Sequence, residues 1–245
     1  MTGGAGVEGV RIGTAIVSYI EPHAGVAREF NRWYERDHFP AAVLAGPGAY
    51  SGARFVATRE CKDARVAGSL FGDPALGSYL SIAWLLPGAQ AGWDAWVATQ
   101  METLAVEGRM FAGRDHLHTA VYEYLWDAAA ADAPPASLAL ERRYPGVVAI
   151  AVAGHEDGSA EAWAARLAGP ELPVIVGLRR ERLLVSVLGV PEPEPHLLLL
   201  ALVDGDVIDV WRRRVEPALA SLDGVGFGGP FLATVPGTDT YTDQL

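Results

Sequence analysis

Residues 30–40 of this chain read FNRWYERDHFP. Together with Val26 this stretch places apolar side chains at positions 26, 30 and 33, the i, i+4, i+7 spacing of one helix face. Residues 21–23 (EPH) break the chain before this helix, and residues 46–48 (GPG) forbid regular structure after it. The stretch therefore predicts a helix that begins near Ala24 and ends in a charged last turn.

Outward from this helix, one order of elements occurs twice. Apolar or alternating runs predict strands, and apolar side chains at helical spacing predict helices. The first half is predicted as strand 10–20, the helix from 24, strands 50–59 and 79–86, helix 93–104 and strand 116–126. The second half is predicted as strand 147–153, helix 160–167, strands 174–187 and 196–203, helix 208–222 and strand 227–235. Both halves therefore read β-α-β-β-α-β.

This order predicts an α+β protein built from two ferredoxin-like repeats, each a four-stranded antiparallel sheet with helices on one face. The first repeat is placed at 10–127 and the second at 138–240, with an Ala-, Asp- and Pro-rich linker at 128–137. The uncovered face of each sheet must also be buried, and the sheet of the other repeat is its natural partner. We expect the two sheets to pack into a barrel within one chain.

Composition excludes several classes of protein. The chain has 245 residues, a net charge of −11 and a pI of about 4.9, which opposes binding to nucleic acid or to an anionic membrane surface. Its longest apolar run, Leu197–Val203, is far shorter than a membrane span. Cys61 is the single cysteine, so no disulfide can form within the chain. These features predict a cytoplasmic protein with no nucleic-acid or membrane partner.

The opening stretch also carries the best candidate for chemistry. His38 falls in the charged last turn of the predicted helix, where the helix dipole favours a protonated imidazole. A histidine with a pKa near 6.5 can act as a general acid or base at neutral pH, with Glu35 or Asp37 to orient it. The local pattern alone favours a surface histidine beside solvated charges, because charged helix ends are common.

The same residues resemble a known family. The EthD-type branch of the dimeric α+β barrel superfamily has a helix that reads roughly F-N-x-W-Y-x-x-x-H-x-P, then a Pro-Gly turn and a strand that opens with Arg-Phe. The matching positions here are Phe30, Trp33, Tyr34, His38, Pro40, Pro47-Gly48 and Arg54-Phe55. The resemblance covers about residues 10–126. The second half matches in element order alone and has no equivalent motif around Trp163.

The resemblance implies an intramolecular dimeric α+β barrel whose interior holds a small, often aromatic or polyketide-like molecule. Relatives include cofactor-free cyclases, monooxygenases and lyases, and more distant ones bind haem. In several of them the histidine that matches His38 faces the cavity and works with a tyrosine. Here that tyrosine is Tyr34, or a strand residue such as Tyr19 or Tyr79.

A second group of candidates lies at the start of the strand 116–126. His116 and His118 are two residues apart, so on a regular strand they share a face. On a cavity face they could bind a substrate oxygen, or a metal if a third ligand joined them. Tyr122, Tyr124 and Trp126 continue the same alternation and predict an aromatic wall.

Other residues are weaker candidates. Arg54 could hold an anionic group through both of its terminal nitrogens, or could pair with Glu35 or Asp37. His155 and His196 are predicted at the surface. Cys61 is predicted as a spare thiol in a loop.

We therefore expect a cofactor-independent cyclase, dehydratase or related lyase that acts on a hydrophobic, oxygenated small molecule. The expected catalytic residues are His38 and Tyr34. The expected substrate-binding residues are Tyr19, Trp33, Arg54, Tyr79, His116 and His118, with no metal and no cofactor. One pocket is expected to be lined by Tyr34, His38, Arg54, Tyr79 and His118. The alternatives are a non-catalytic binding protein and a cofactor-free monooxygenase of the same fold. In each case we expect a monomer or a homodimer.

Overall fold

The computed structural model describes residues 9–68, 70–154, 158–184 and 195–245. Its strands are β1 (Thr14–Pro22), β2 (Ala49–Val56), β3 (Val66–Ala67), β4 (Tyr79–Leu85), β5 (Arg114–Ala129), β6 (Gly146–Ala153), β7 (Val174–Leu183), β8 (His196–Val203) and β9 (Val225–Ala233). Its longer helices are α1 (Ala27–Trp33), α3 (Gln90–Val106) and α4 (Ser159–Leu167). The shorter helical segments are η1 (Tyr34–His38), η2 (Pro40–Leu44), α2 (Arg59–Asp63), η3 (Ala136–Leu138), α5 (Val207–Val210), η4 (Trp211–Val215), α6 (Glu216–Ala218) and η5 (Leu219–Ser221). His155 and the predicted strand residues 185–187 lie outside the described residues.

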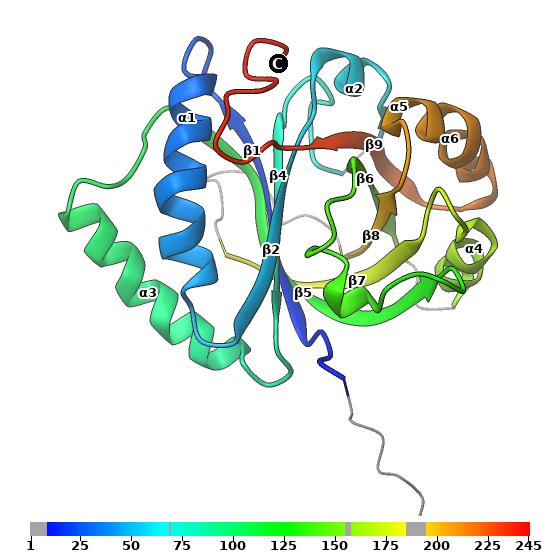
Figure 1. Cartoon of the computed structure of the whole chain (residues 1–245), viewed down its shortest axis with the longest axis horizontal. Helices are drawn as coiled ribbons and strands as arrows, with labels where there is room; N and C mark the ends of the chain where they lie inside the picture. The colour runs from blue at the N-terminus through cyan, green and yellow to red at the C-terminus, as the bar shows by residue number, and fades with distance from the viewer. Residues whose placement is uncertain (1–8, 69, 155–157, 185–194) are drawn as a thin grey trace, which may run out of the picture.

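The strands form a closed barrel, and the predicted fold class is confirmed. Neighbouring strands run in the order β2-β4-β1-β5-β7-β8-β6-β9, and β9 pairs again with β2. Among the described residues this closes an antiparallel barrel of eight strands, with the two-residue β3 added beside β9. Each half has the strand order of a ferredoxin-like sheet. In Figure 1 the helices α1 and α3 cover one side of the barrel, and α4, α5 and α6 cover the other.

The two halves meet along seams of very different length. On one side β5 pairs with β7 from Ala120–Leu183 to Ala129–Val174. On the other side, within the described ranges, β2 pairs with β9 only at Phe55–Ala233 and Val56–Leu232. We call this second junction the short seam. Because β2 pairs with β9 only at its end, most of its outer edge borders other segments of the chain.

Alternation along the strands sorts side chains between the interior and the outer layers. Ala15, Val17 and Tyr19 of β1 belong to the buried cluster inside the barrel, whereas Ile16 and Ile20 pack beneath the helices of the first half. The interior is filled by apolar side chains from both halves, including Trp84, Tyr122, Leu200 and Phe231. Apolar burial on this scale is the dominant stabilising term of the fold.

The junction between the halves differs from the predicted linker. β5 continues to Ala129, so the first two residues of the stretch 128–137 extend the long seam instead of leaving the sheet. Cross-strand pairing with Val174 and Ile175 orders this segment in spite of its composition. The predicted limits of the two repeats, 10–127 and 138–240, remain predictions.

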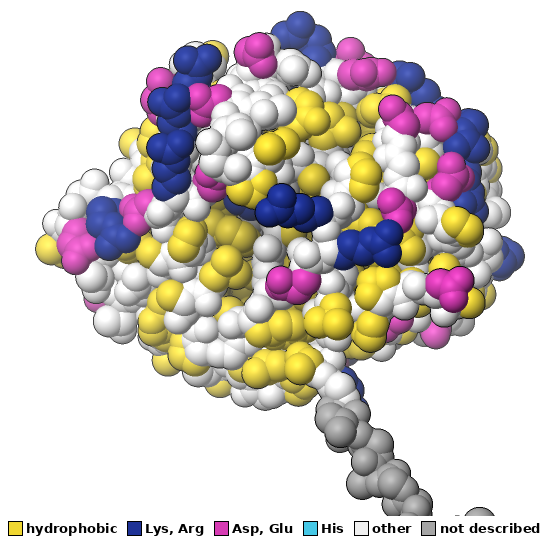
Figure 2. Space-filling model, in the orientation of Figure 1, with side chains coloured by type: hydrophobic (Ala, Val, Ile, Leu, Met, Phe, Trp, Pro, Cys, Tyr) yellow, Lys and Arg dark blue, Asp and Glu magenta, His cyan; other side chains and the backbone are white. Residues whose placement is uncertain are grey.

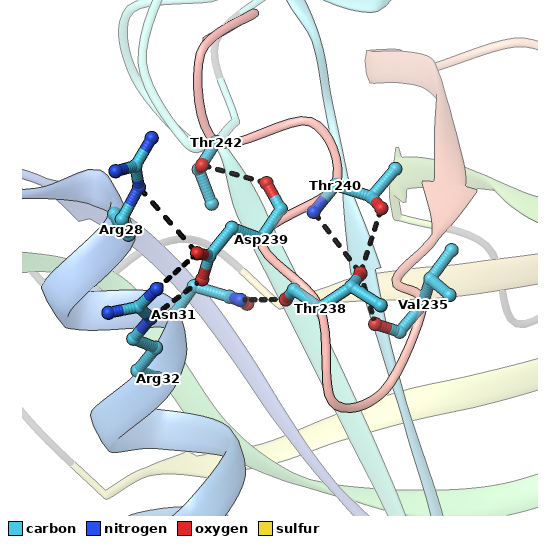
Figure 3. A network of polar contacts seen from close by, with 8 residues as sticks. All are labelled: Arg28, Asn31, Arg32, Val235, Thr238, Asp239, Thr240 and Thr242. Carbon is cyan, nitrogen blue, oxygen red and sulfur yellow. Dashed lines mark hydrogen bonds and ion pairs between the residues drawn. The ribbon is translucent and has the colours of Figure 1, made fainter.

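The C-terminal segment after β9 returns to the first half and lies along α1 (Figures 1 and 3). Asn31 Nδ2 donates to the carbonyl of Thr238 at 3.0 Å, and Arg32 Nε donates to Asp239 Oδ1 at 2.9 Å. Arg28 adds an ion pair to Asp239 at 3.7 Å. The segment therefore ties the end of the second half to the first helix. None of the helices in the described ranges is both long and apolar enough to cross a membrane.

Candidate functional site

The helix that carries the FNRWYERDHFP stretch does not end at its charged turn. It continues from α1 through the π-helical segments η1 and η2 as far as Leu44. Phe39 N–H donates to the carbonyl of Tyr34, five residues back, so the turn is wider than in an α-helix. A wide turn accommodates Pro40, whose ring would clash with the carbonyl of the preceding α-helical turn. The prediction that His38 lies at a helix C-terminus is therefore wrong.

Tyr34 is buried between this helix and the outer face of the sheet. Its hydroxyl lies 2.8 Å from the hydroxyl of Ser81 on β4. Desolvation raises the pKa of Tyr34, so the phenol stays protonated at neutral pH. Ser18 on β1 is buried in the same layer and also interacts with Tyr34. This chain of buried hydroxyl groups is the first sign of a site here.

His38 lies beside Tyr34 and is 7% exposed. Its ring stacks on Trp33, with 4.4 Å between ring centroids, and its centroid is 5.3 Å from that of Tyr34. Burial, with a smaller effect from the nearby Arg114, lowers the pKa of His38 to about 3. The imidazole is therefore neutral at pH 7, contrary to the expectation of a pKa near 6.5. No described residue hydrogen-bonds to its Nδ1 atom, which is buried.

His116 borders the same layer and can be assigned a tautomer. Arg114 Nε donates to His116 Nε2 at 3.1 Å, so Nε2 must be the unprotonated nitrogen. The proton therefore sits on Nδ1, which lies 3.0 Å from the hydroxyl of Thr119. Burial and Arg114 lower the pKa of His116 to about 4, which agrees with a neutral ring. The Arg114 guanidinium lies 4.7 Å from the centroid of the Trp33 ring.

Arg54 lies on β2 and also contacts Tyr34. Its guanidinium carbon is 4.8 Å from the centroid of Tyr34 and 5.4 Å from that of Tyr79. Nη2 donates to Asn31 Oδ1 at 3.2 Å, and Nη1 lies 4.0 Å from Glu35 Oε2. Of the two partners considered from the sequence, Glu35 is the one beside it. Asp37 instead pairs with Arg109.

A groove of about 820 Å³ opens at the short seam, next to Arg54. It runs between the helix of the first half, the outer edge of β2 and the segment that leads into β6. Its apolar walls include Phe39, Leu44, Leu140, Leu202 and Leu232. In Figure 2 apolar side chains gather on the face in front of β2 and β6, with basic side chains among them. Gly52 lets the helix pack closely on β2 at the groove, since a Cβ there would lie 2.7 Å from Leu44 Cδ2.

His118 and Tyr19 lie elsewhere, inside the barrel. His118 pairs with Tyr19 of β1 while His116 pairs with Ile20, so Leu117 between them has no partner on that strand and forms a bulge. The bulge places the two histidines on opposite faces of the sheet, and the prediction that they share a face is wrong. Tyr19 donates its hydroxyl to the carbonyl of Leu76 at 2.9 Å.

Inside the barrel His118 belongs to a buried polar triad. The Tyr122 hydroxyl lies 2.7 Å from His118 Nε2 and 2.8 Å from His196 Nε2. A phenol has one proton, so it donates to one ring and accepts from the other. His196 is 3% exposed, and its predicted surface position is wrong. Phe71 covers the triad, with its ring centroid 4.8 Å from that of His118.

The predicted site residues therefore form two groups instead of one pocket. Tyr34, His38, Trp33, Tyr79, Arg54 and His116 lie in the layer between the first-half helix and the sheet. Tyr19 and His118 lie inside the barrel, on the other face. The predicted aromatic wall is also divided, because Trp126 follows a second bulge and packs in the outer layer beside α4.

Sequence reasoning missed several contributors to these groups. Arg114, Ser81 and Thr119 carry no local pattern that marks them, because their role depends on the pairing of β1 with β4 and β5. Cys61 is buried in α2, where its N–H donates to the hydroxyl of the capping Thr58, and is not in a loop. Within the described ranges, no three His, Cys, Asp or Glu side chains come together as a metal site.

Comparisons with solved structures agree with this fold. An anthrone oxidase-like protein has a TM-score of 0.56 at 12% identity, covering 94% of this chain and 95% of its own. A candidate monooxygenase from Fusobacterium nucleatum has a TM-score of 0.51 at 6% identity, covering 91% and 93%. A candidate chlorite dismutase has a TM-score of 0.52 at 10% identity, covering 96% and 100%. No family model and no curated protein sequence matches the chain. The chain has the dimeric α+β barrel fold, and at these identities the likeness concerns the fold alone.

Proposed function

We propose that the protein is a cofactor-independent enzyme that moves a proton on a small, hydrophobic, oxygenated substrate. The reaction class is a cyclase, a dehydratase or a related lyase, and the substrate is aromatic or polyketide-like. The observation that carries the proposal is His38, a buried and neutral imidazole whose Nδ1 has no hydrogen-bond partner among the described residues. It lies in a π-helical turn, a feature that occurs frequently at functional sites.

Each neighbouring group has a role in this scheme. Neutral His38 accepts a proton from a carbon acid next to a carbonyl group, and the substrate becomes an enolate. Arg114 supplies positive charge close to His38 and stabilises the negative oxygen as it develops. That negative charge also offsets the desolvation that lowers the pKa of His38, so the imidazole gains proton affinity when it is needed. Tyr34, held by Ser81, positions the substrate oxygen.

We infer that the chain belongs to the EthD-type branch of its fold. This inference is supported by the residues Phe30, Trp33, Tyr34, His38 and Pro40, all of which lie in the α1–η1–η2 helix. The proposed partner is a hydrophobic small molecule, and the proposed assembly is a monomer or a homodimer. The single cysteine supports a cytoplasmic location.

A cofactor-free monooxygenase is the second candidate, and one observation favours it. Aromatic rings crowd the layer around His38: Trp33 stacks on Phe111 at 5.5 Å between centroids, and Phe30 lies 6.0 Å from Trp33. A flat phenolic substrate suits such surroundings. The names of the anthrone oxidase-like protein and the candidate monooxygenase point the same way. In this scheme anthrone and O₂ give anthraquinone and water after His38 has removed a proton from the substrate.

One pair of assays separates these candidates. Anthrone is incubated with the protein in D₂O without oxygen, and deuterium uptake at its acidic carbon is followed by NMR. The same mixture is then exposed to air, and anthraquinone is measured by absorbance. Deuterium uptake above the buffer rate supports proton transfer, and added quinone formation supports the oxygenase. A third outcome is that the protein binds anthrone but catalyses neither reaction, with anthrone or with a set of phenols and 1,3-diketones. That outcome supports a non-catalytic binding protein and contradicts both enzymes.

A further inference from the structure

The groove at the short seam contains an unmatched pair of charged groups. Arg54 Nη1 and Glu35 Oε2 are both buried, and neither has a hydrogen-bond partner among the residues that the structure describes. They lie 4.0 Å apart, too far to bond directly. The Arg54 side chain is 5% exposed, and both residues line the groove. A buried donor and acceptor left in this state are costly, so a ligand that satisfies both gains binding free energy.

One other polar atom of each side chain is already engaged, which helps to fix the orientation of the pair. Arg54 Nη2 donates to Asn31 Oδ1 at 3.2 Å, and Asn31 in turn donates to the carbonyl of Thr238. Glu35 Oε1 accepts from Gly237 N–H at 2.7 Å. The C-terminal segment therefore holds both side chains so that Nη1 and Oε2 are the atoms left for a ligand.

The geometry and the charge select one kind of group. Arg54 and Glu35 cancel each other in charge, so an ionised ligand group would leave a net charge buried in the groove. A single oxygen about 2.8 Å from both atoms would see them at an angle of roughly 90°, which a hydroxyl group accommodates. A neutral hydroxyl accepts from Arg54 and donates to Glu35 through that one oxygen. The lining of the groove also includes the apolar side chains of Phe39, Leu140 and Leu202.

We propose that this groove is a binding site for a neutral alcohol or phenol with an apolar body, whose hydroxyl bridges Arg54 Nη1 and Glu35 Oε2. The site is distinct from the proposed reaction at His38 and does not depend on it. His38 is not among the residues that line this groove, whereas Tyr34 contacts both Arg54 and His38. The proposal is therefore tested by binding alone, and its failure leaves the proton-transfer assays unaffected.

The test compares two probes of nearly equal shape. 2-Naphthol donates and accepts through its oxygen, whereas 2-methoxynaphthalene can only accept. Both are titrated into the 245-residue chain by calorimetry at pH 7, where naphthol is neutral. The hydrogen bond to Glu35 should make naphthol bind roughly ten- to hundredfold more tightly. Equal affinities for the two probes, or binding of neither, would overturn the proposal.

The decisive variant is Glu35→Gln. Its carbonyl oxygen keeps the bond from Gly237 N–H, which turns the amide NH₂ toward Arg54 in place of Oε2. The site then presents two donors, so the preference for naphthol should disappear or reverse in favour of the methoxy probe. Loss of folding cannot imitate such a reversal. Retention of the naphthol preference in this variant would contradict the proposal.

Two further variants make the outcome independent of how Glu35→Gln folds. Glu141→Gln is the matched control, because Glu141 lines the same groove but is exposed, and it should keep the wild-type preference. Val235→Trp places a large ring on an exposed residue at the groove. It should lower the affinity for both probes alike, by at least roughly tenfold, because the ring occludes the site. Unchanged binding in Val235→Trp would place the probes elsewhere and reject the groove as the site.

Discussion

His116 and His118 are separated by one residue, yet they lie on opposite faces of the barrel wall. His116 pairs with Ile20 and His118 with Tyr19, so the intervening Leu117 bulges out of the ladder. One histidine joins the layer beneath the first-half helix, and the other joins the triad inside the barrel. The bulge thus divides the polar residues of β5 between two environments that have separate functions in this account.

The triad inside the barrel predicts a specific cost for losing one hydroxyl. Tyr122→Phe leaves Nε2 of His118 and of His196 without the phenol between them, in a fully buried position. We expect the free energy of unfolding to fall by about 1–3 kcal/mol. Tyr50→Phe is the control, because no described residue hydrogen-bonds to the buried hydroxyl of Tyr50. Denaturant melts that show equal losses for the two variants would contradict a structural role for the triad.

The buried state of His38 predicts how stability depends on pH. Its pKa is about 3 in the folded protein and about 6.5 in the unfolded chain, so the unfolded chain binds the proton first as pH falls. Burial of the neutral His38 ring therefore does not lower the free energy of unfolding above about pH 6.5. As the pH falls from 6.5 toward 3, the free energy of unfolding decreases. At pH 5 the loss is roughly 2 kcal/mol.

Replacement of His38 by Gln should therefore make the decline in stability between pH 7 and pH 5 less steep, measured by urea unfolding, while His116, whose pKa is also lowered by burial, keeps part of the decline. His23→Gln, the same change at a histidine whose side chain is half-exposed, is measured alongside as the control for a histidine outside the buried layer. If His38→Gln declines as steeply as the wild type does, His38 is not held neutral by burial.

Close packing of the helix on β2 predicts opposite effects for two glycines. A Cβ on Gly52 would lie 2.7 Å from Leu44 Cδ2 and 2.8 Å from Phe39 Cζ, so Gly52→Ala should destabilise by about 1–3 kcal/mol. Gly92 lies in α3 with nothing within 4 Å of an added Cβ. Gly92→Ala should stabilise by up to about 1 kcal/mol, because alanine favours the helix. Thermal melts in which both changes act in the same direction would argue against this packing.

The C-terminal segment predicts a local effect from one exposed contact. Asp239 joins the segment to Arg28 and Arg32 of α1 (Figure 3). Asp239→Ala should speed hydrogen exchange at Gly237 N–H and along the segment while the barrel strands keep their protection. High salt should have the same effect on the wild type, since exposed ion pairs are screened. Exchange that quickens equally in the strands would show that the segment is part of the global folding unit.

Much of the fold was predictable because it depends on local periodicity. The alternating and helical runs define the β-α-β-β-α-β order, and one-sided helices require a second sheet. The site was less accessible, since it depends on departures from regularity. The bulge at Leu117 reverses the faces that simple alternation predicts, and the π turn lets the helix pass Pro40. The burial of His196 depends on Tyr122, 74 residues away, and no local pattern encodes that contact.

The proposed function requires His38 to accept the proton in the reaction. This requirement is tested most directly by the rate of deuterium uptake into anthrone, compared between the wild type and His38→Gln in the absence of oxygen. We predict that the variant is slower than the wild type by a factor on the order of 10²–10⁴, as expected when a positioned base is removed. Its unfolding free energy at pH 7 should fall by only about 1 kcal/mol, from the lost stacking on Trp33. A folded variant that exchanges deuterium as fast as the wild type would contradict the account.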